Sequence, residues 1–241
     1  MKQKHKTENE NSLRRAQPRR SYSYLFVIVV AIFITCLITA NIMSVKLIKI
    51  LGVVLPAGIL IFPLSYIAGD VLTEVYGYSQ ARKVIWLGFF CNFIVVFVIW
   101  LGKIIPPAPF WGGQAAYESI LGYAPRLLMA SFLAYLVGEF FNAFIMAKMK
   151  IATKGRWLWT RTIASTLVGQ GFDSLVFITL GFVGTIPAGA LASAIIVQWL
   201  VKSAYEAAAT PLTYKVVGFL KLYEGVDVYD YGTHFNPLLI K

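Results

Sequence analysis

Five acidic residues interrupt the long apolar runs of this 241-residue chain. They are Asp70, Glu74, Glu139, Asp173 and Glu206. Lys202 is the one basic residue at comparable depth. A charged group within lipid costs on the order of 3 kcal/mol or more unless it faces a partner, water or a ligand. Because carboxylates accept N–H donors in pairs, the chemistry that these residues offer is recognition of a small polar molecule.

Polar side chains recur at helical spacing, so they fall into stripes. Tyr66, Asp70 and Glu74 are four residues apart, as are Gln198, Lys202 and Glu206. Asn142 lies three residues after Glu139, and Gln170 lies three residues before Asp173. Asn41 lies near the end of the first apolar run. The candidate substrate-binding residues are Asn41, Asp70, Glu74, Glu139, Asn142, Gln170, Asp173, Gln198, Lys202 and Glu206. Polar stripes on four helices predict a shared central cavity. We expect no catalytic residues, no metal ligands and no cofactor.

Structural roles remain open for several of these residues. Glu74 could be solvated at the cytoplasmic end of its helix, and Lys202 with Glu206 could form a structural ion pair one helical turn apart. The amide side chains could be interhelical hydrogen-bonding groups, worth on the order of 1 kcal/mol each.

The composition indicates a polytopic membrane protein. Hydrophobic residues make up 58% of the chain and charged residues only 14%, against roughly 25% charged residues in ordinary soluble domains. This composition therefore disfavours a soluble nucleic-acid-binding protein despite a net charge of +11. Both histidines lie outside the apolar runs, which disfavours a membrane-embedded hydrolase. The chain carries no nucleotide-binding motif.

Six apolar stretches have about the 20 residues that cross a bilayer. They lie near 24–45, 54–76, 84–102, 125–147, 162–184 and 189–213. We predict an all-α membrane protein with six transmembrane helices (21–217), a disordered basic cytosolic tail (1–20) and a cytosolic C-terminal tail (218–241). Pro63 is expected to kink the second helix and Pro211 to end the sixth.

The distribution of basic residues predicts the orientation. With the N-terminus inside, the cytoplasmic segments collect 17 Lys and Arg residues and the opposite side collects 4. The positive-inside rule therefore places both termini in the cytoplasm, with the chain in the inner membrane.

Four segments resemble the queuosine-precursor transporters, a branch of the vitamin uptake transporter family. They are FPLSYIAGDVLTEVYGYSQARK (62–83), AYLVGEFFNAFIMAKMK (134–150), TRTIASTLVGQGFDSLVF (160–177) and VKSAYEAAATPLTYKVV (201–217). The resemblance implies six transmembrane helices and import of 7-deazaguanines such as preQ0 and preQ1 for tRNA queuosine salvage. It also implies kinship with substrate-capture subunits of energy-coupling-factor importers. The alternative is such a subunit for another vitamin-like heterocycle, working with a separate ATPase module.

The polar stripes suit that substrate class. A deazaguanine presents N1–H beside an exocyclic amine, which a carboxylate can accept as a pair, and a carbonyl oxygen that requires a donor. We expect Glu139 or Asp173 to bind the guanine-like edge. The expected partners are this small molecule and membrane lipid, without nucleic acid. Coupling to protons and assembly into a homo-oligomer are left open.

Overall fold

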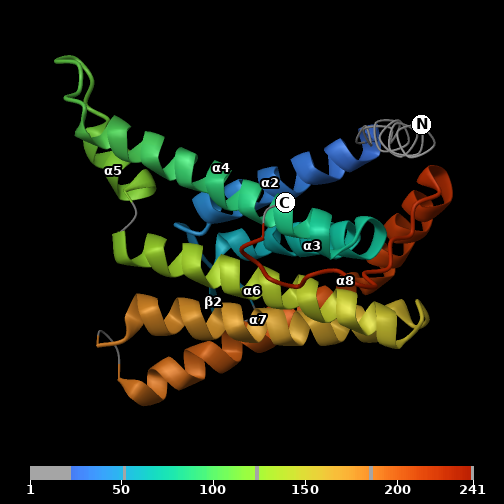
Figure 1. Cartoon of the computed structure of the whole chain (residues 1–241). Helices are drawn as coiled ribbons and strands as arrows, with labels where there is room; N and C mark the ends of the chain where they lie inside the picture. Colours follow the sequence, from blue (N-terminus) through green and yellow to red (C-terminus); the bar gives the residue numbers. More distant parts are fainter. Residues whose placement is uncertain (1–22, 51–52, 123–124, 185–186, 240–241) are drawn as a thin grey trace, which may run out of the picture.

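The computed structural model describes residues 23–50, 53–122, 125–184 and 187–239 (Figure 1). The predicted tail at 1–20 lies outside the described residues. Within these ranges there are seven α-helices, one antiparallel hairpin and one 3-10 turn. The helices are α2 (Tyr24–Met43), α3 (Phe62–Tyr76), α4 (Tyr78–Ile104), α5 (Gln114–Leu121), α6 (Pro125–Ala152), α7 (Leu158–Phe182) and α8 (Ala188–Glu224). The hairpin pairs β1 (Leu47–Ile50) with β2 (Val53–Pro56), and η1 (Ala57–Leu60) follows it.

Five of these helices are long and apolar enough to cross a membrane: α2, α4, α7, α8 and the Met129–Ala152 part of α6. Large apolar side chains such as Phe93, Phe97 and Trp100 are exposed on α4. An exposed apolar surface of this kind suits contact with lipid rather than water. The predicted class, an α-helical membrane protein, agrees with this architecture.

The second predicted span is not one continuous helix. Residues 53–60 form β2 and η1, and only 15 residues form α3. At 1.5 Å per residue, α3 is roughly 22 Å long, short of the roughly 30 Å of hydrocarbon. Pro63 lies in the first turn of α3 and does not kink it, because the amide hydrogen that proline lacks has no helical acceptor there. The expected kink is therefore wrong.

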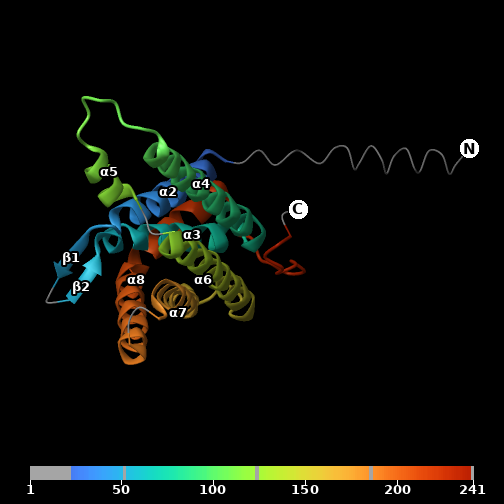
Figure 2. The same ribbon diagram turned by 90° about the vertical axis from the view of Figure 1, so that its left-hand side faces the viewer.

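Helix α3 is nevertheless the centre of the bundle. It packs against α2, α4, α6 and α8, and 12 of its 15 residues are buried. A helix buried on all its faces belongs in a core rather than at a surface. Figure 2 shows the bundle end-on, with the β1–β2 hairpin projecting to one side.

Helix α8 extends beyond its predicted end. Pro211 lies inside the helix, which continues to Glu224. A proline within a helix removes one backbone hydrogen bond, and burial of Thr213, Val217 and Leu220 offsets that loss. The expectation that Pro211 ends this helix is therefore wrong.

The residues after α8 fold back onto the bundle, and we name residues 225–239 the C-terminal strap. Arg82 Nη1 donates to the backbone oxygens of His234 and Asn236 at 2.9 and 2.7 Å. The Asp230 carboxylate accepts from the Tyr78 amide at 3.0 Å, so it satisfies a donor at the start of α4. Gly77 has φ +84°, and a Cβ there would lie 2.7 Å from Val228 Cγ1. This junction therefore requires glycine.

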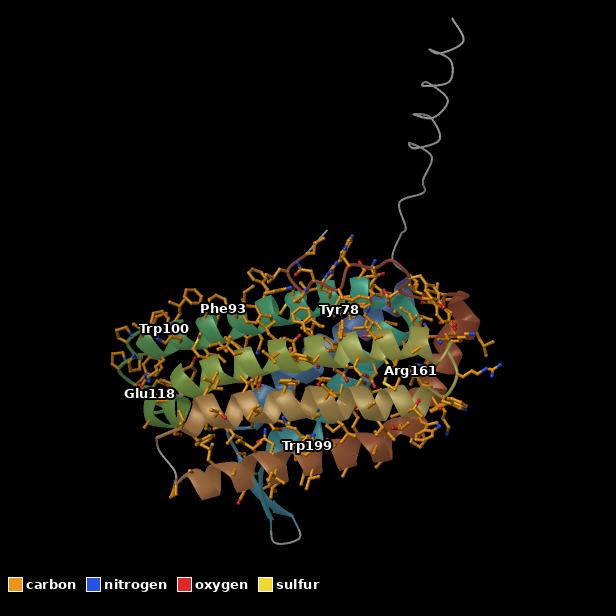
Figure 3. All side chains as sticks on the ribbon, turned by 60° about the horizontal axis from the view of Figure 1, so that its bottom comes forward. Tyr78, Phe93, Trp100, Glu118, Arg161 and Trp199 are labelled. Atoms are coloured by element: carbon orange, nitrogen blue, oxygen red, sulfur yellow. The ribbon has the colours of Figure 1, made fainter. Side chains whose placement is uncertain are left out.

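Several helix ends converge at one end of the bundle. The Ser23 hydroxyl, before α2, donates to the Glu224 carboxylate at the end of α8. The Val228 amide donates to the Val75 carbonyl near the end of α3 at 3.1 Å. Figure 3 shows Arg161, near the start of α7, at this end, and Glu118 of α5 with Trp100 at the opposite end. We call the first of these the convergent end.

Candidate functional site

Glu74 is completely buried at the convergent end and is fully paired. Arg161 donates from Nε and Nη2 to the two carboxylate oxygens, each at 2.7 Å. Lys221 Nζ lies 2.5 Å from Glu74 Oε1 and Lys150 Nζ lies 3.7 Å from it. We call these residues, together with Asp227, the Glu74 cluster. Two-pronged contact between guanidinium and carboxylate is the strongest form of ion pair.

Asp227 belongs to the C-terminal strap and completes the Glu74 cluster. Its Oδ1 accepts from Lys150 Nζ at 2.5 Å and lies 2.9 Å from Lys221 Nζ. Burial by itself raises the pKa of Asp227, but the hydrogen bonds and charges of the two lysines outweigh it, so the pKa is lowered. Glu74 is therefore neither solvated nor open to a ligand, and its surroundings fit a structural role.

A second cluster lies deeper in the bundle, on α3, α6, α7 and α8. Asn142 Nδ2 donates to Asp70 Oδ1 at 2.9 Å, which links α6 to α3. Lys202 Nζ donates to Asp173 Oδ2 at 2.5 Å, which links α8 to α7. The predicted alternative of a structural pair between Lys202 and Glu206 is therefore wrong. We name this cluster the polar core, and it consists of Tyr66, Asp70, Glu139, Asn142, Thr166, Gln170, Asp173, Lys202, Ser203 and Glu206.

The carboxylates of the polar core are close enough to interact. Glu139 interacts electrostatically with Asp70 and Asp173, and Glu206 interacts with Asp70. Tyr66 is within electrostatic range of Glu139, Asp173 and Glu206. Four acidic side chains thus share a region with one described basic side chain, Lys202. Like charges in low dielectric repel strongly, so this arrangement favours a ligand that brings hydrogen-bond donors or positive charge.

Two glycines let α6 and α7 approach closely enough to form the polar core. A Cβ on Gly138 would lie 2.9 Å from Asp173 Cβ, and one on Gly169 would lie 2.9 Å from Asn142 Cβ. Each glycine therefore faces a polar-core residue of the other helix. Small residues at such crossings are typical of helix packing in membranes.

Several buried polar atoms of this region have no hydrogen-bond partner among the described residues. They are Asp70 Oδ2, Asn142 Oδ1, Thr166 Oγ1, Gln170 Oε1, Ser174 Oγ, Ser203 Oγ and both Glu206 carboxylate oxygens. Leaving such an atom without a partner costs about 1–3 kcal/mol, and native proteins satisfy more than about 90% of them. Their concentration at one place, with acceptors outnumbering donors, is typical of a site that binds a donor-rich molecule.

Two further predicted site residues are only partly buried. Asn41 is half-buried near the end of α2, where Ser131 Oγ donates to its Oδ1 at 3.4 Å. Gln198 is half-buried on α8, one turn before Lys202. With Glu74 in its own cluster, the structure brings together seven of the ten predicted residues: Asp70, Glu139, Asn142, Gln170, Asp173, Lys202 and Glu206.

Thr166, Ser203 and Tyr66 belong to the polar core but were not among the site residues predicted from the sequence. Helical spacing could have identified Thr166, which precedes Gln170 by four residues, and Ser203, which precedes Glu206 by three. Lys150, Arg161 and Lys221 look like ordinary interfacial charges in the sequence. Nothing in their spacing signals that they converge on Glu74.

Long apolar helices around a buried polar core define an α-helical membrane transport protein. The chain belongs to the family described as "Putative vitamin uptake transporter", whose sequence model matches residues 56–216. This confirms the family resemblance and identifies a transporter rather than an enzyme. In the described residues there is no group of three or more His, Cys, Asp or Glu side chains that could hold a metal ion.

Individual relatives carry more specific names. A "Probable queuosine precursor transporter" of Bacillus subtilis (strain 168) is 32% identical over 178 residues, which are 73% of this chain and 78% of the relative. A "Queuosine precursor transporter" of Escherichia coli (strain K12) is 27% identical over 139 residues, 56% of this chain and 58% of the relative. A third, from Haemophilus influenzae, is 27% identical over 125 residues, 52% of this chain and 51% of the relative. No solved structure matches the chain.

Proposed function

We propose that this chain imports queuosine precursors, 7-deazaguanines such as preQ0 and preQ1, for tRNA queuosine salvage. The substrate binds in the polar core, in a cavity between α3, α6, α7 and α8. The observation that carries the binding site is the group of buried acceptor oxygens without partners. The names and coverage of the relatives support the substrate class.

The chemistry of the substrate complements the polar core. The heterocycle offers N1–H and an exocyclic amine as donors, and preQ1 adds a cationic aminomethyl group. Four carboxylates against one lysine provide the acceptors and the negative charge that such a molecule requires. The hydroxyl of Thr166 and the amide of Gln170 can donate to the ring carbonyl.

We further propose six crossings of the inner membrane with both termini in the cytoplasm. Helix α3 carries the chain back between α2 and α4, both of which begin at the convergent end (Figure 1). Arg82, Lys150, Arg161 and Lys221 all lie at that end. By the positive-inside rule, the convergent end faces the cytoplasm.

Uptake by the purified chain in proteoliposomes tests the proposed function. We expect the proteoliposomes to take up labelled preQ0 or preQ1. Queuine or unlabelled precursor should compete with this uptake, and a panel of vitamins should not affect it. No uptake or binding of any deazaguanine would contradict the proposal. Binding without uptake, restored by a co-purified ATPase module, would favour the substrate-capture alternative.

Asp173→Asn and Glu139→Gln variants test the place of binding. We expect each to insert normally and to lose uptake, since each changes a carboxylate of the polar core. Glu118→Gln, on α5 at the opposite end of the bundle, is the matched control (Figure 3). Full transport by both variants would show that the substrate does not bind in the polar core.

A further inference from the structure

The carboxylates of the polar core differ in how far the protein already satisfies them. Asp173 is bonded to the Lys202 ammonium at 2.5 Å, and one oxygen of Asp70 is bonded to the Asn142 amide at 2.9 Å. Glu206 is only 2% exposed, yet neither of its oxygens has a hydrogen-bond partner among the described residues. Both Glu206 oxygens are therefore fully buried acceptors that a ligand could occupy.

The residues around Glu206 are also unsatisfied. Thr166 and Gln170, one turn apart on α7, face Glu206 without reaching ordinary hydrogen-bond geometry. On α8 itself, Ser203 Oγ lies one turn before Glu206 and has no partner in the described part of the chain. Two helices thus present a buried carboxylate, an amide and hydroxyls to the same place.

Lys202 cannot supply what Glu206 lacks without giving up its present contacts. Its ammonium is bonded to Asp173 and lies 4.3 Å from the centre of the Phe62 ring. A cation held by both a carboxylate and an aromatic face is well satisfied. The lysine therefore neutralises Asp173 and leaves Glu206 for an external donor.

We infer that Glu206 binds the N1–H and exocyclic amine edge of the deazaguanine, with Thr166 and Gln170 beside it, and that the Lys202–Asp173 pair does not take part in reading this edge. Two neighbouring N–H donors match the two oxygens of one carboxylate. This inference rests on the proposed function and specifies which carboxylate determines substrate specificity. It departs from our sequence-based expectation, which assigned the edge to Glu139 or Asp173.

The test compares two ligands that differ only in the exocyclic amine. Binding of preQ1 and of its analogue without that amine is measured on the wild-type protein, Glu206→Gln and the control Glu118→Gln in nanodiscs. We expect the wild-type protein and the control to prefer preQ1 by about 10-fold or more, as expected for one additional charge-assisted hydrogen bond. In Glu206→Gln, we expect that preference to fall below about threefold, since the substituted amide places an N–H donor against the amine.

Binding of the analogue to Glu206→Gln also reports that this variant is folded. A wild-type preference retained in Glu206→Gln would overturn the inference, as would an equal loss of affinity for both ligands. If the glutamine variant does not fold, Glu206→Asp answers the same question, because it keeps the charge but withdraws it by one methylene. We expect a reduced preference there, and an unchanged one would overturn the inference. A wild-type protein that binds no deazaguanine would instead contradict the proposed function.

Discussion

Asp70 and Glu74 lie one turn apart on the same buried helix, yet their surroundings are opposite. Glu74 receives two hydrogen bonds from Arg161 and one from Lys221, with Lys150 beside it. Asp70 receives one hydrogen bond from an amide and keeps an oxygen without a partner in the described residues. Both carboxylates are equally buried, so burial alone does not distinguish a structural acid from a binding one. The completeness of pairing differs, and under the proposed function it separates a structural acid from a binding one.

The difference has an energetic basis. Removing one partner of a buried ion pair costs about 3–5 kcal/mol, because the remaining charge is left without compensation. A cluster such as that of Glu74 therefore resists change, whereas acceptors without partners leave free energy to be gained when a ligand arrives. We expect mutations in the first region to affect stability and those in the second to affect transport.

The largest expected effect is that of Arg161→Met on stability. Loss of the guanidinium leaves the buried Glu74 carboxylate with two lysines in place of three cationic partners, and we expect a loss of about 3–5 kcal/mol. Thermal unfolding in detergent measures it. The double variant Arg161→Met with Glu74→Gln should lose less than Arg161→Met alone. If Arg161→Met were as stable as the wild-type protein, the distinction between the two regions would fail.

Gly138→Ala should have the next largest effect and should lower both stability and uptake. Its Cβ would lie 2.9 Å from Asp173 Cβ, so α6 and α7 must separate at the polar core, at a cost of about 1–3 kcal/mol. Uptake should fall in parallel because the same shift displaces Asp173. Gly218→Ala is the matched control, since a Cβ there meets no atom within 4 Å. Normal uptake by Gly138→Ala would show that the close crossing is not needed.

Asp70→Asn should lower uptake while leaving stability nearly unchanged. The substituted side chain removes a buried charge but retains an oxygen for Asn142 to bond, so we expect a change in stability of less than about 1 kcal/mol. Uptake should fall about 10-fold, the equivalent of about 1.4 kcal/mol. Melting temperature and initial uptake rate are measured on the same preparation. A marked loss of stability with normal uptake would assign Asp70 to the same structural role as Glu74.

The smallest expected effect is that of Asp227→Asn on the loss of stability at acid pH. Its folded-state pKa is lowered by Lys150 and Lys221, so its contribution is present above the ordinary aspartate pKa of about 4. That contribution is lost as the pH falls through the lowered folded-state value. We expect Asp227→Asn to unfold slightly more readily at neutral pH and to depend less on pH below about 4. Unfolding curves at several pH values measure this, and identical acid dependence in both proteins would contradict it.

The sequence predicts much of the polar core because helical spacing is local. The stripes place Asp70, Glu139, Gln170 and Asp173 on inward faces, and the fold brings them together. The pairing of Lys202 with Asp173 rather than Glu206 depends on how α7 and α8 cross. Spacing along one helix carries no information about such a crossing.

Other features had no sequence signal or an ambiguous one. Residues 53–60 are apolar enough to extend a helix, and a short apolar run does not distinguish strand from helix. The C-terminal strap has the composition of a loop, and besides the contacts of Asp227 and Asp230 it attaches through backbone oxygens that accept from Arg82 and Trp86. Contacts made by the main chain leave no pattern in the side chains.

The C-terminal strap also sets the order in which the protein can be completed during synthesis. Residues 228 and 230, which satisfy the Val75 carbonyl and the Tyr78 amide, are translated about 150 residues after the helices that they contact. The junction between α3 and α4 is therefore synthesised well before its final hydrogen-bond partners. It acquires them only after α5, α6, α7 and α8 have been synthesised, so a late segment completes the junction between two early helices.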